Sequence, residues 1–116
     1  MKYVFLSAYM LGIVAGQLLF KVAANRLAGA ASWSDKVMLL LVTPHFYAAS
    51  ALYALLTVLW IWILTIVPLS RAYPFIAVSI VLTQLAGAVF FAEPLSARFL
   101  LGSGLILVGL LLTQDL

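Results

Sequence analysis

The sequence predicts an all-α integral membrane protein with four transmembrane helices. Its composition is the first observation: 67% of the residues are hydrophobic and only 8% are charged, which is far from the balance of a water-soluble domain. Its length is the second, because 116 residues provide four helices of the roughly 20 residues that a bilayer core requires. Third, the apolar runs are long and lack the strict alternation of barrel strands, which favours helices.

The first apolar run is predicted to cross the membrane at about residues 3–24. It ends in a polar connection rich in small residues, "NRLAGAASWSDK". A secretory signal peptide would also combine an apolar run with small residues, here at 28–30. Gln17 and Lys21 interrupt the apolar run, so we interpret it as a retained transmembrane span.

The second span is predicted at about residues 42–67. Pro44 suits the first turn of its helix, because proline lacks the amide proton that would be unsatisfied there. Trp60 lies near the far end, where aromatic residues are enriched at membrane interfaces. His45, the only histidine, is interpreted as an interfacial residue at the helix start rather than a proton relay.

The last two spans are predicted at about residues 72–92 and 97–113. The connection "PLSR" before the third span is so short that neighbouring spans must be antiparallel. Glu93 and Pro94 are expected to start the last helix, with proline in its first turn and the carboxylate beside the positive end of the helix dipole. The chain is therefore expected to form a single four-helix domain over residues 1–116, with both termini on the same side of the membrane.

Several classes of function are not indicated. The chain contains no cysteine, so thiolate metal sites and cysteine nucleophiles are excluded. It has no Walker A motif, no H-x-x-x-H pair and no Gly-x-Ser-x-Gly turn. The six basic residues form no run of the kind that binds nucleic acid. We therefore predict no enzymatic activity, cofactor, metal site or nucleic-acid partner, and take the lipid bilayer as the chain's surroundings.

A stripe of small residues follows one side of the last span. Gly102 and Gly109 are seven residues apart, about 20° short of two full turns, with Leu105 and Ile106 between them. Small residues let helix backbones approach closely in lipid. The stripe is a candidate dimer interface, and the alternative is packing within one chain. Because a four-helix bundle packs its own centre, a transport function would require a partner.

Four further residues are candidates for lining a cavity. Ser79 and Thr83 are spaced to share one face of the third span, a pattern that helix packing alone also explains. Ile13 and Trp60 are the candidates on the first two spans.

Four segments carry a resemblance to a known family: "GQLLFK", "VPLSRAYPF", "FAEPLSARFLLG" and "GLILVG". They resemble the four-helix, SMR/EamA-like proteins of the drug/metabolite transporter superfamily. These include the small multidrug resistance (SMR) family and, more similar still, the subunits of the aminoarabinose-phosphoundecaprenol flippase. The similarity covers most of the chain and is weakest at 26–42. The SMR dimer pattern Gly-x-x-Leu-Ile-x-x-Gly matches the stripe in the last span, which implies a dimer with a second copy or with a related subunit.

One departure from the SMR pattern concerns the cargo. SMR exporters carry a membrane-embedded glutamate in the first helix, and the resemblance places Ile13 at that position. The three acidic residues, Asp35, Glu93 and Asp115, all lie outside the predicted spans. No carboxylate in the hydrocarbon can then exchange a cation for a proton. The sequence therefore favours an anionic cargo over a cationic drug.

Lys21 and Arg71 are candidate contacts for a lipid phosphate at opposite sides of the membrane. Gln17 lies one turn from Lys21 on the same helix face, and Tyr73 follows Arg71. Other interpretations stay open: both cations could extend to the interface without any cargo, Lys21 could pair with Glu93, and Gln17 could form an interhelical hydrogen bond.

The resemblance implies a half-transporter for a polyprenyl-phosphate-linked sugar in the bacterial inner membrane, with an undecaprenyl carrier and an aminosugar destined for lipopolysaccharide modification. The residues themselves indicate only an anionic amphiphile. A cationic-drug exporter and a membrane scaffold without transport activity are the alternatives.

Overall fold

The computed structural model describes residues 2–114, and all of its regular structure is helical. Asp115 lies outside these residues. The prediction of an all-α protein is confirmed. The described helices are α1 (Lys2–Leu27), α2 (Trp33–Leu41), α3 (Pro44–Leu64), α4 (Leu69–Phe91) and α5 (Ala97–Thr113).

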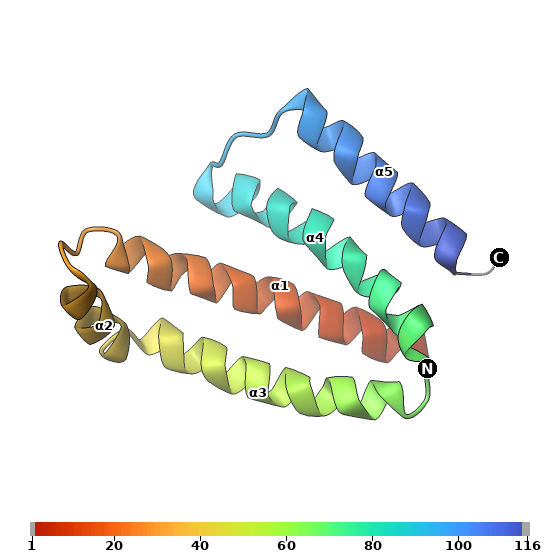
Figure 1. Cartoon of the computed structure of the whole chain (residues 1–116), viewed down its shortest axis with the longest axis horizontal. Helices are drawn as coiled ribbons and strands as arrows, with labels where there is room; N and C mark the ends of the chain where they lie inside the picture. Colours follow the sequence, from red (N-terminus) through yellow and green to blue (C-terminus); the bar gives the residue numbers. More distant parts are fainter. Residues whose placement is uncertain (1, 115–116) are drawn as a thin grey trace.

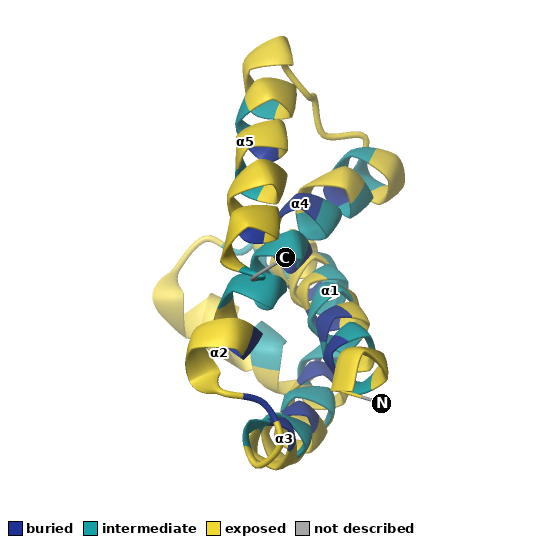
Figure 2. Ribbon diagram, turned by 90° about the vertical axis from the view of Figure 1, so that its right-hand side faces the viewer, coloured by how far each residue is buried: buried dark blue, intermediate teal, exposed yellow. Residues whose placement is uncertain are grey.

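The long helices lie side by side in the order α3, α1, α4, α5 (Figure 1). The molecule measures 51 × 37 × 20 Å along its principal axes, so they form an open layer rather than a bundle. The expectation that four helices would enclose a common centre is therefore wrong. The physical reason lies in α5, which buries Ser103 and Leu110 and packs on α4 at the edge of the layer (Figure 2).

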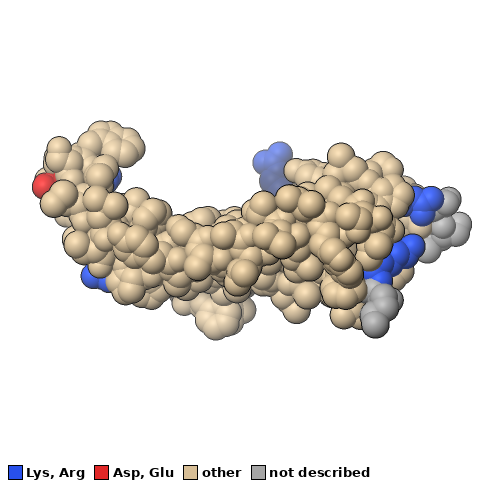
Figure 3. Space-filling model, turned by 90° about the horizontal axis from the view of Figure 1, so that it is seen from below, with Lys and Arg blue, Asp and Glu red and all other residues tan. Residues whose placement is uncertain are grey.

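Three of these helices, α1, α3 and α4, are long and apolar enough to cross a membrane. The fourth, α5, is apolar but shorter, with 17 residues, which corresponds to about 26 Å at 1.5 Å per residue. Most of the face seen in Figure 3 carries no charged side chain. A surface of this kind suits hydrocarbon, so the chain is a multi-pass membrane protein.

Two glycines of α1 allow its close approach to α3. A Cβ atom at Gly12 would lie 2.6 Å from Cδ2 of Leu56, and one at Gly16 would collide with the ring of Tyr53. Both glycines face α3 one turn apart, which is the small-residue spacing that lets membrane helices approach each other. The Tyr53 ring also stacks on Phe20, with centroids 5.0 Å apart.

An apolar cluster lies at the other end of the contact between α1 and α3, where α1 begins and α3 ends. Leu6 of α1, Ile63 and Val67 around the end of α3, and Ala72 of α4 are buried together. Ala72 brings the start of α4 against the other two helices. The turn after α3 is thus fixed by packing, and α4 returns antiparallel along α1.

The short helix α2 was not predicted, since its residues were assigned to the polar connection and to the approach to the second span. Its first turn is capped by Ser32, whose Oγ accepts a hydrogen bond from the backbone N–H of Asp35 at 3.2 Å. That serine-to-aspartate spacing is a helix-start signal. Trp33 and Met38 are exposed on α2, as on helices that rest at a membrane interface.

The last helix starts later than expected. Glu93 and Pro94 lie in the connection between α4 and α5, and Ser96 is the N-cap of α5, accepting from the backbone N–H of Phe99 at 3.0 Å. The prediction that Glu93 and Pro94 start this helix is wrong. Ala92, in the left-handed conformation at φ 52°, ends α4 and turns the chain away from the helix axis.

Gly16→Ala is expected to destabilise the contact between α1 and α3. The new Cβ would occupy space filled by the Tyr53 ring, and stacking on Phe20 restricts where that ring can move. We expect the free energy of unfolding in micelles to fall by about 1–3 kcal/mol, the usual cost of overpacking.

The measurement is reversible unfolding by SDS in mixed micelles, followed by tryptophan fluorescence. Gly104→Ala is the matched control, because a Cβ at this glycine of α5 would meet no atom within 4 Å. Equal loss of stability in the two variants would contradict the proposed close packing.

Candidate functional site

Six of the predicted site residues come together between α1 and α4. A hollow of about 170 Å³ there is lined by Gln17, Lys21, Thr83 and Glu93. It shares Gln17 and Thr83 with a second hollow of about 230 Å³, which adds Ile13 and Ser79. We call the two together the α1–α4 cleft. Its other lining residues are Leu18, Ile80, Gln84, Gly87 and Phe91.

Lys21 and Glu93 form an ion pair at one end of the α1–α4 cleft. The lysine Nζ lies 3.5 Å from Oε2 of the glutamate, and the side chains are 44% and 49% exposed, respectively. Lys21 lies about two turns before the end of α1, so its amine is near the depth of lipid headgroups. An exposed pair of this kind stabilises a fold by about 1 kcal/mol or less, and each partner is open to another ion.

The end of α4 holds the carboxylate of Glu93 in place. Glu93 Oε1 lies in the space that a side chain at residue 87 would fill, and only glycine leaves this space open. The backbone N–H groups of Ala92 and Glu93 both point to the carbonyl of Gly87. The left-handed Ala92 is an uncommon backbone state for a residue with a Cβ. Glu93 is thereby folded back over α4 toward Lys21.

Gln17 takes part in an interhelical hydrogen bond, one of the roles considered from the sequence. Its Nε2 donates to the hydroxyl of Tyr53 on α3 at 2.9 Å. Since Tyr53 also packs against Gly16 and Phe20, the amide is held beside Lys21 in the cleft by contacts with the neighbouring helix. Gln17 thus serves both packing and the polar lining.

Ser79 and Ile13 line the part of the cleft farther from Lys21. Ser79 is buried, and its hydroxyl donates to the carbonyl of Ile76 at 2.6 Å, so its proton is used within α4. Ile13 has an apolar side chain at the place where the SMR resemblance would have put a carboxylate. The lining here has hydroxyl and amide groups without an acid.

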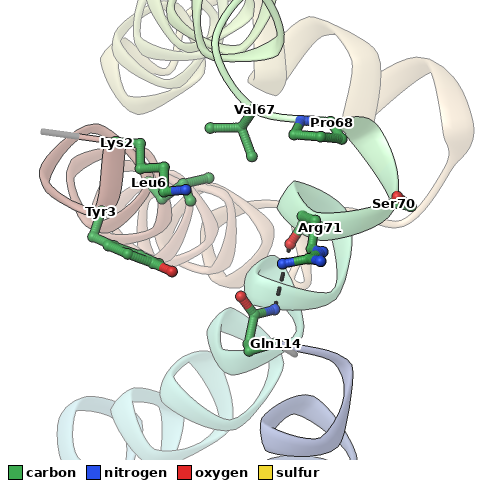
Figure 4. Close-up of a pocket in the computed structure, with 8 residues that line it drawn as sticks. All are labelled: Lys2, Tyr3, Leu6, Val67, Pro68, Ser70, Arg71 and Gln114. Atoms are coloured by element: carbon green, nitrogen blue, oxygen red, sulfur yellow. Dashed lines mark hydrogen bonds between the residues drawn. The ribbon is translucent and has the colours of Figure 1, made fainter. Parts of the chain in front are cut away.

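Arg71 lies at the opposite end of the layer from Lys21. It borders a hollow of about 420 Å³ with Lys2, Tyr3 and Ser70 (Figure 4). The carbonyl of Arg71 accepts a hydrogen bond from Nε2 of Gln114 at 3.4 Å. Two cationic residues therefore gather where α1 begins and α4 begins. The two ends of the described chain meet here as well.

Tyr73 and Trp60 lie outside both of these regions. Their ring centroids are 6.4 Å apart, and Trp60 stacks on Tyr9 at 4.9 Å. Neither residue lines the α1–α4 cleft or the hollow at Arg71. The expectations that Trp60 lines a substrate cavity and that Tyr73 accompanies Arg71 at a headgroup site gain no support from this geometry. Both rings instead belong to an aromatic cluster at the end of α3.

The glycine stripe of α5 is only partly covered within the described chain. A Cβ at Gly102 or Gly109 would meet no atom of the described residues within 4 Å, and Leu105 is 67% exposed. Gly109 is exposed as well, whereas Gly102 and Ile106 are partly buried. The fully buried residues of α5 are Ser103 and Leu110. Space therefore remains along the stripe for another helix.

Sequence reasoning missed Tyr53, Gly87 and Phe91. Tyr53 has no motif around it that would mark it as the partner of Gln17. Gly87 likewise has no motif around it. Its role depends on the backbone turn at Ala92, for which the local sequence contains no glycine or asparagine signal.

Curated relatives of the chain are named "Probable 4-amino-4-deoxy-L-arabinose-phosphoundecaprenol flippase subunit ArnE". The relative from Sodalis glossinidius is 32% identical over 108 residues, which cover 93% of this chain and 90% of the relative. The relative from Aeromonas hydrophila is 39% identical over 74 residues, 64% of this chain and 65% of the relative. The relative from Hamiltonella defensa is 43% identical over 54 residues, 47% of this chain and 49% of the relative.

The matched segment thus spans about half the length of the Hamiltonella relative and most of the Sodalis relative. No protein-family model matches the chain. No solved structure matches it significantly.

A cysteine pair can test the geometry at the cleft, because the chain contains no cysteine of its own. Lys21→Cys combined with Glu93→Cys is expected to crosslink efficiently in membranes with a short bifunctional thiol reagent, since these side chains meet. The yield is read from a mobility shift on a denaturing gel after proteolysis between the two sites.

Lys21→Cys combined with Arg71→Cys is the control. Lys21 lies near the end of α1 and Arg71 near the start of the antiparallel α4, so these positions are at opposite ends of the layer and should give no intramolecular product. Similar yields from the two pairs would contradict the arrangement of α1 and α4.

Proposed function

We propose that this chain, which belongs to the family of ArnE flippase subunits, moves a polyprenyl-phosphate-linked aminosugar across the bacterial inner membrane. The names of its relatives supply the cargo class, an aminoarabinose on phosphoundecaprenol. The chain would act as a transporter subunit and not as an enzyme. The helices α1, α3, α4 and α5 would all cross the membrane and together form one domain.

The α1–α4 cleft is the observation that carries this proposal. A phosphate linked to a lipid carries negative charge at headgroup depth, where cationic and hydrogen-bonding groups can bind it. Lys21 offers the charge near the end of α1, and Gln17 and Thr83 offer polar groups beside it. Between the ends of the cleft the lining is uncharged, so a sugar headgroup would meet hydrogen-bonding groups as it crosses.

The absence of an acid in the spans argues against export of cationic drugs. The sequences of α1, α3, α4 and α5 contain no Asp or Glu. A cation would have no carboxylate to bind inside the hydrocarbon, and no acidic group there would release a proton in exchange. Ile13 lines the cleft at the position where the SMR resemblance would place the glutamate of a cationic-drug exporter.

The opposite end would meet the headgroup after it crosses. Arg71 and Lys2 border the hollow there with the hydroxyl-bearing residues Tyr3 and Ser70. A phosphate needs a favourable site at each membrane surface, neither of which may bind it too tightly for release. A cationic group at each end of α1 fits that requirement.

The transporter would be a dimer that uses the stripe of α5. An open layer of helices cannot shield a polar headgroup from lipid on both faces. Along the stripe formed by Gly102, Leu105, Ile106 and Gly109, a Cβ at either glycine would meet no described atom within 4 Å, and Leu105 and Gly109 are exposed. A helix of a second copy, or of a related four-helix subunit, would pack closely against it. The resemblance to the SMR dimer pattern supports the same residues.

Variants of Lys21 are expected to rank by charge. Lys21→Arg should retain much of the flipping activity, because the positive charge is kept. Lys21→Gln should lose a charge-assisted contact of about 1.5–3 kcal/mol, which lowers binding roughly ten- to a hundredfold. Lys21→Glu should repel the phosphate and be the weakest. The measurement is flipping of the phosphopolyprenyl-aminosugar in vesicles at matched protein levels.

The charge-swapped variant, Lys21→Glu with Glu93→Lys, distinguishes a binding role from a structural one. It preserves an ion pair but moves the negative charge to α1 and the positive charge to the connection after α4. Recovery of wild-type flipping by the swap would show that the pair matters only for the fold. Wild-type rates for Lys21→Gln would likewise remove this residue from the cargo site.

Replacing both Gly102 and Gly109 with Ile is expected to weaken the dimer. The added side chains would force the helices apart and remove close dispersion contacts along the stripe. Because a Cβ at either position meets nothing inside the chain, the monomer should still insert and fold. Crosslinking in membranes and the mass in detergent report the oligomer, and an unchanged dimer would mean that the interface lies elsewhere.

A further inference from the structure

We propose that Glu93 recognises the amino group of the cargo while Lys21 binds its phosphate, so that the Lys21–Glu93 pair is a selectivity filter for a zwitterionic headgroup. This inference rests on the proposed function and adds a binding role for a residue outside the spans. Its basis is the juxtaposition of one acid and one base at the mouth of a single cleft.

The charges of the headgroup and of the cleft are complementary. A lipid phosphodiester carries one negative charge, and an amine on carbon 4 of the sugar carries one positive charge at neutral pH. The cleft presents one positive and one negative side chain, 3.5 Å apart. Binding would exchange one internal ion pair for two pairs with the cargo, and no charge would be left without a partner.

The same exchange explains why a neutral sugar should bind less well. If the phosphate bound Lys21 and the sugar offered no cation, Glu93 would lose its ionic partner among the described residues. For a half-exposed carboxylate this loss costs about 1 kcal/mol or less, which the amine of the aminosugar would restore. Discrimination then comes from the penalty on the wrong cargo rather than from extra contacts with the right one.

The fold keeps Glu93 in position for this exchange. Its carboxylate rests over Gly87 and is directed there by the left-handed Ala92 that ends α4. A loop glutamate needs neither feature merely to reach a lysine, because its side chain is long and the connection is exposed. The carboxylate is therefore held at the cleft wall, where an incoming headgroup must pass it.

The half-exposed state of both side chains supports exchange with a ligand. A buried ion pair would be too costly to separate, whereas an exposed pair contributes about 1 kcal/mol or less. A headgroup that offers two charge-assisted contacts can replace it. The two side chains thus balance each other's charge until the headgroup of the cargo replaces each partner.

The test is a competition between two lipids, followed by native mass spectrometry of the purified protein. One lipid is phosphopolyprenol with 4-amino-4-deoxy-arabinose, and the other is the same lipid with unmodified arabinose. We expect the wild type to retain the aminosugar lipid about tenfold better, equivalent to one paired charge of modest strength. Glu93→Gln should bring the ratio close to one, and Glu93→Asp should keep part of the preference.

Two more variants show whether position or charge alone is responsible. Gly87→Leu keeps both charges but fills the space that the Glu93 carboxylate uses, and it should also bring the ratio close to one. Asp35→Asn removes an acidic residue of α2 that does not line the cleft, and it should leave the ratio unchanged.

The outcomes separate this inference from the proposed function. If the wild type flips the aminosugar lipid but binds both lipids equally, or if Glu93→Gln keeps the wild-type ratio, Glu93 does not recognise the amine and the function stands. If the wild type neither binds nor flips either lipid, both the function and the inference are overturned.

Discussion

A lysine inside a membrane-crossing helix must reach the aqueous surface or meet a group that balances its charge. Lys21 lies close enough to the end of α1 for the first and has Glu93 for the second. The surroundings are arranged to keep that partner in reach: Ala92 turns the chain, and Gly87 leaves room for the carboxylate. The ion pair thereby links the end of α4 to the end of α1 and defines the mouth of the cleft.

The open layer of helices gives this charge arrangement its context. With a thickness of 20 Å, the chain has two broad faces, and a headgroup moving along the α1–α4 cleft would be shielded on one side only. A partner packed on the glycine stripe of α5 would add the missing wall. Cationic side chains at the two ends of the layer, Lys21 of α1 and Arg71 of α4 among them, would then lie at the entrance and the exit of one path.

The sequence was sufficient for the helical membrane architecture, since long apolar runs in lipid leave few alternatives. It also brought together Ile13, Gln17 and Lys21, because spacing on a single helix determines a face. It could not place Trp60, whose partner depends on how α1 and α3 cross. It could not foresee the turn at Ala92 either, because the left-handed state there follows from packing and not from a local signal. Contacts between helices, unlike faces of one helix, require the assembled fold.

The central claim is that the Lys21 end of the α1–α4 cleft binds an anionic glycolipid, and the most direct measurement is the lipid that co-purifies with the protein. Wild-type protein and Lys21→Gln should be purified in parallel from a bacterium that makes phosphopolyprenyl-linked sugars, and their bound lipids compared by mass spectrometry. We expect a phosphopolyprenyl-aminosugar to be enriched over bulk phospholipid in the wild type and depleted in the variant. The same phospholipids in both preparations, without any polyprenyl lipid, would contradict it.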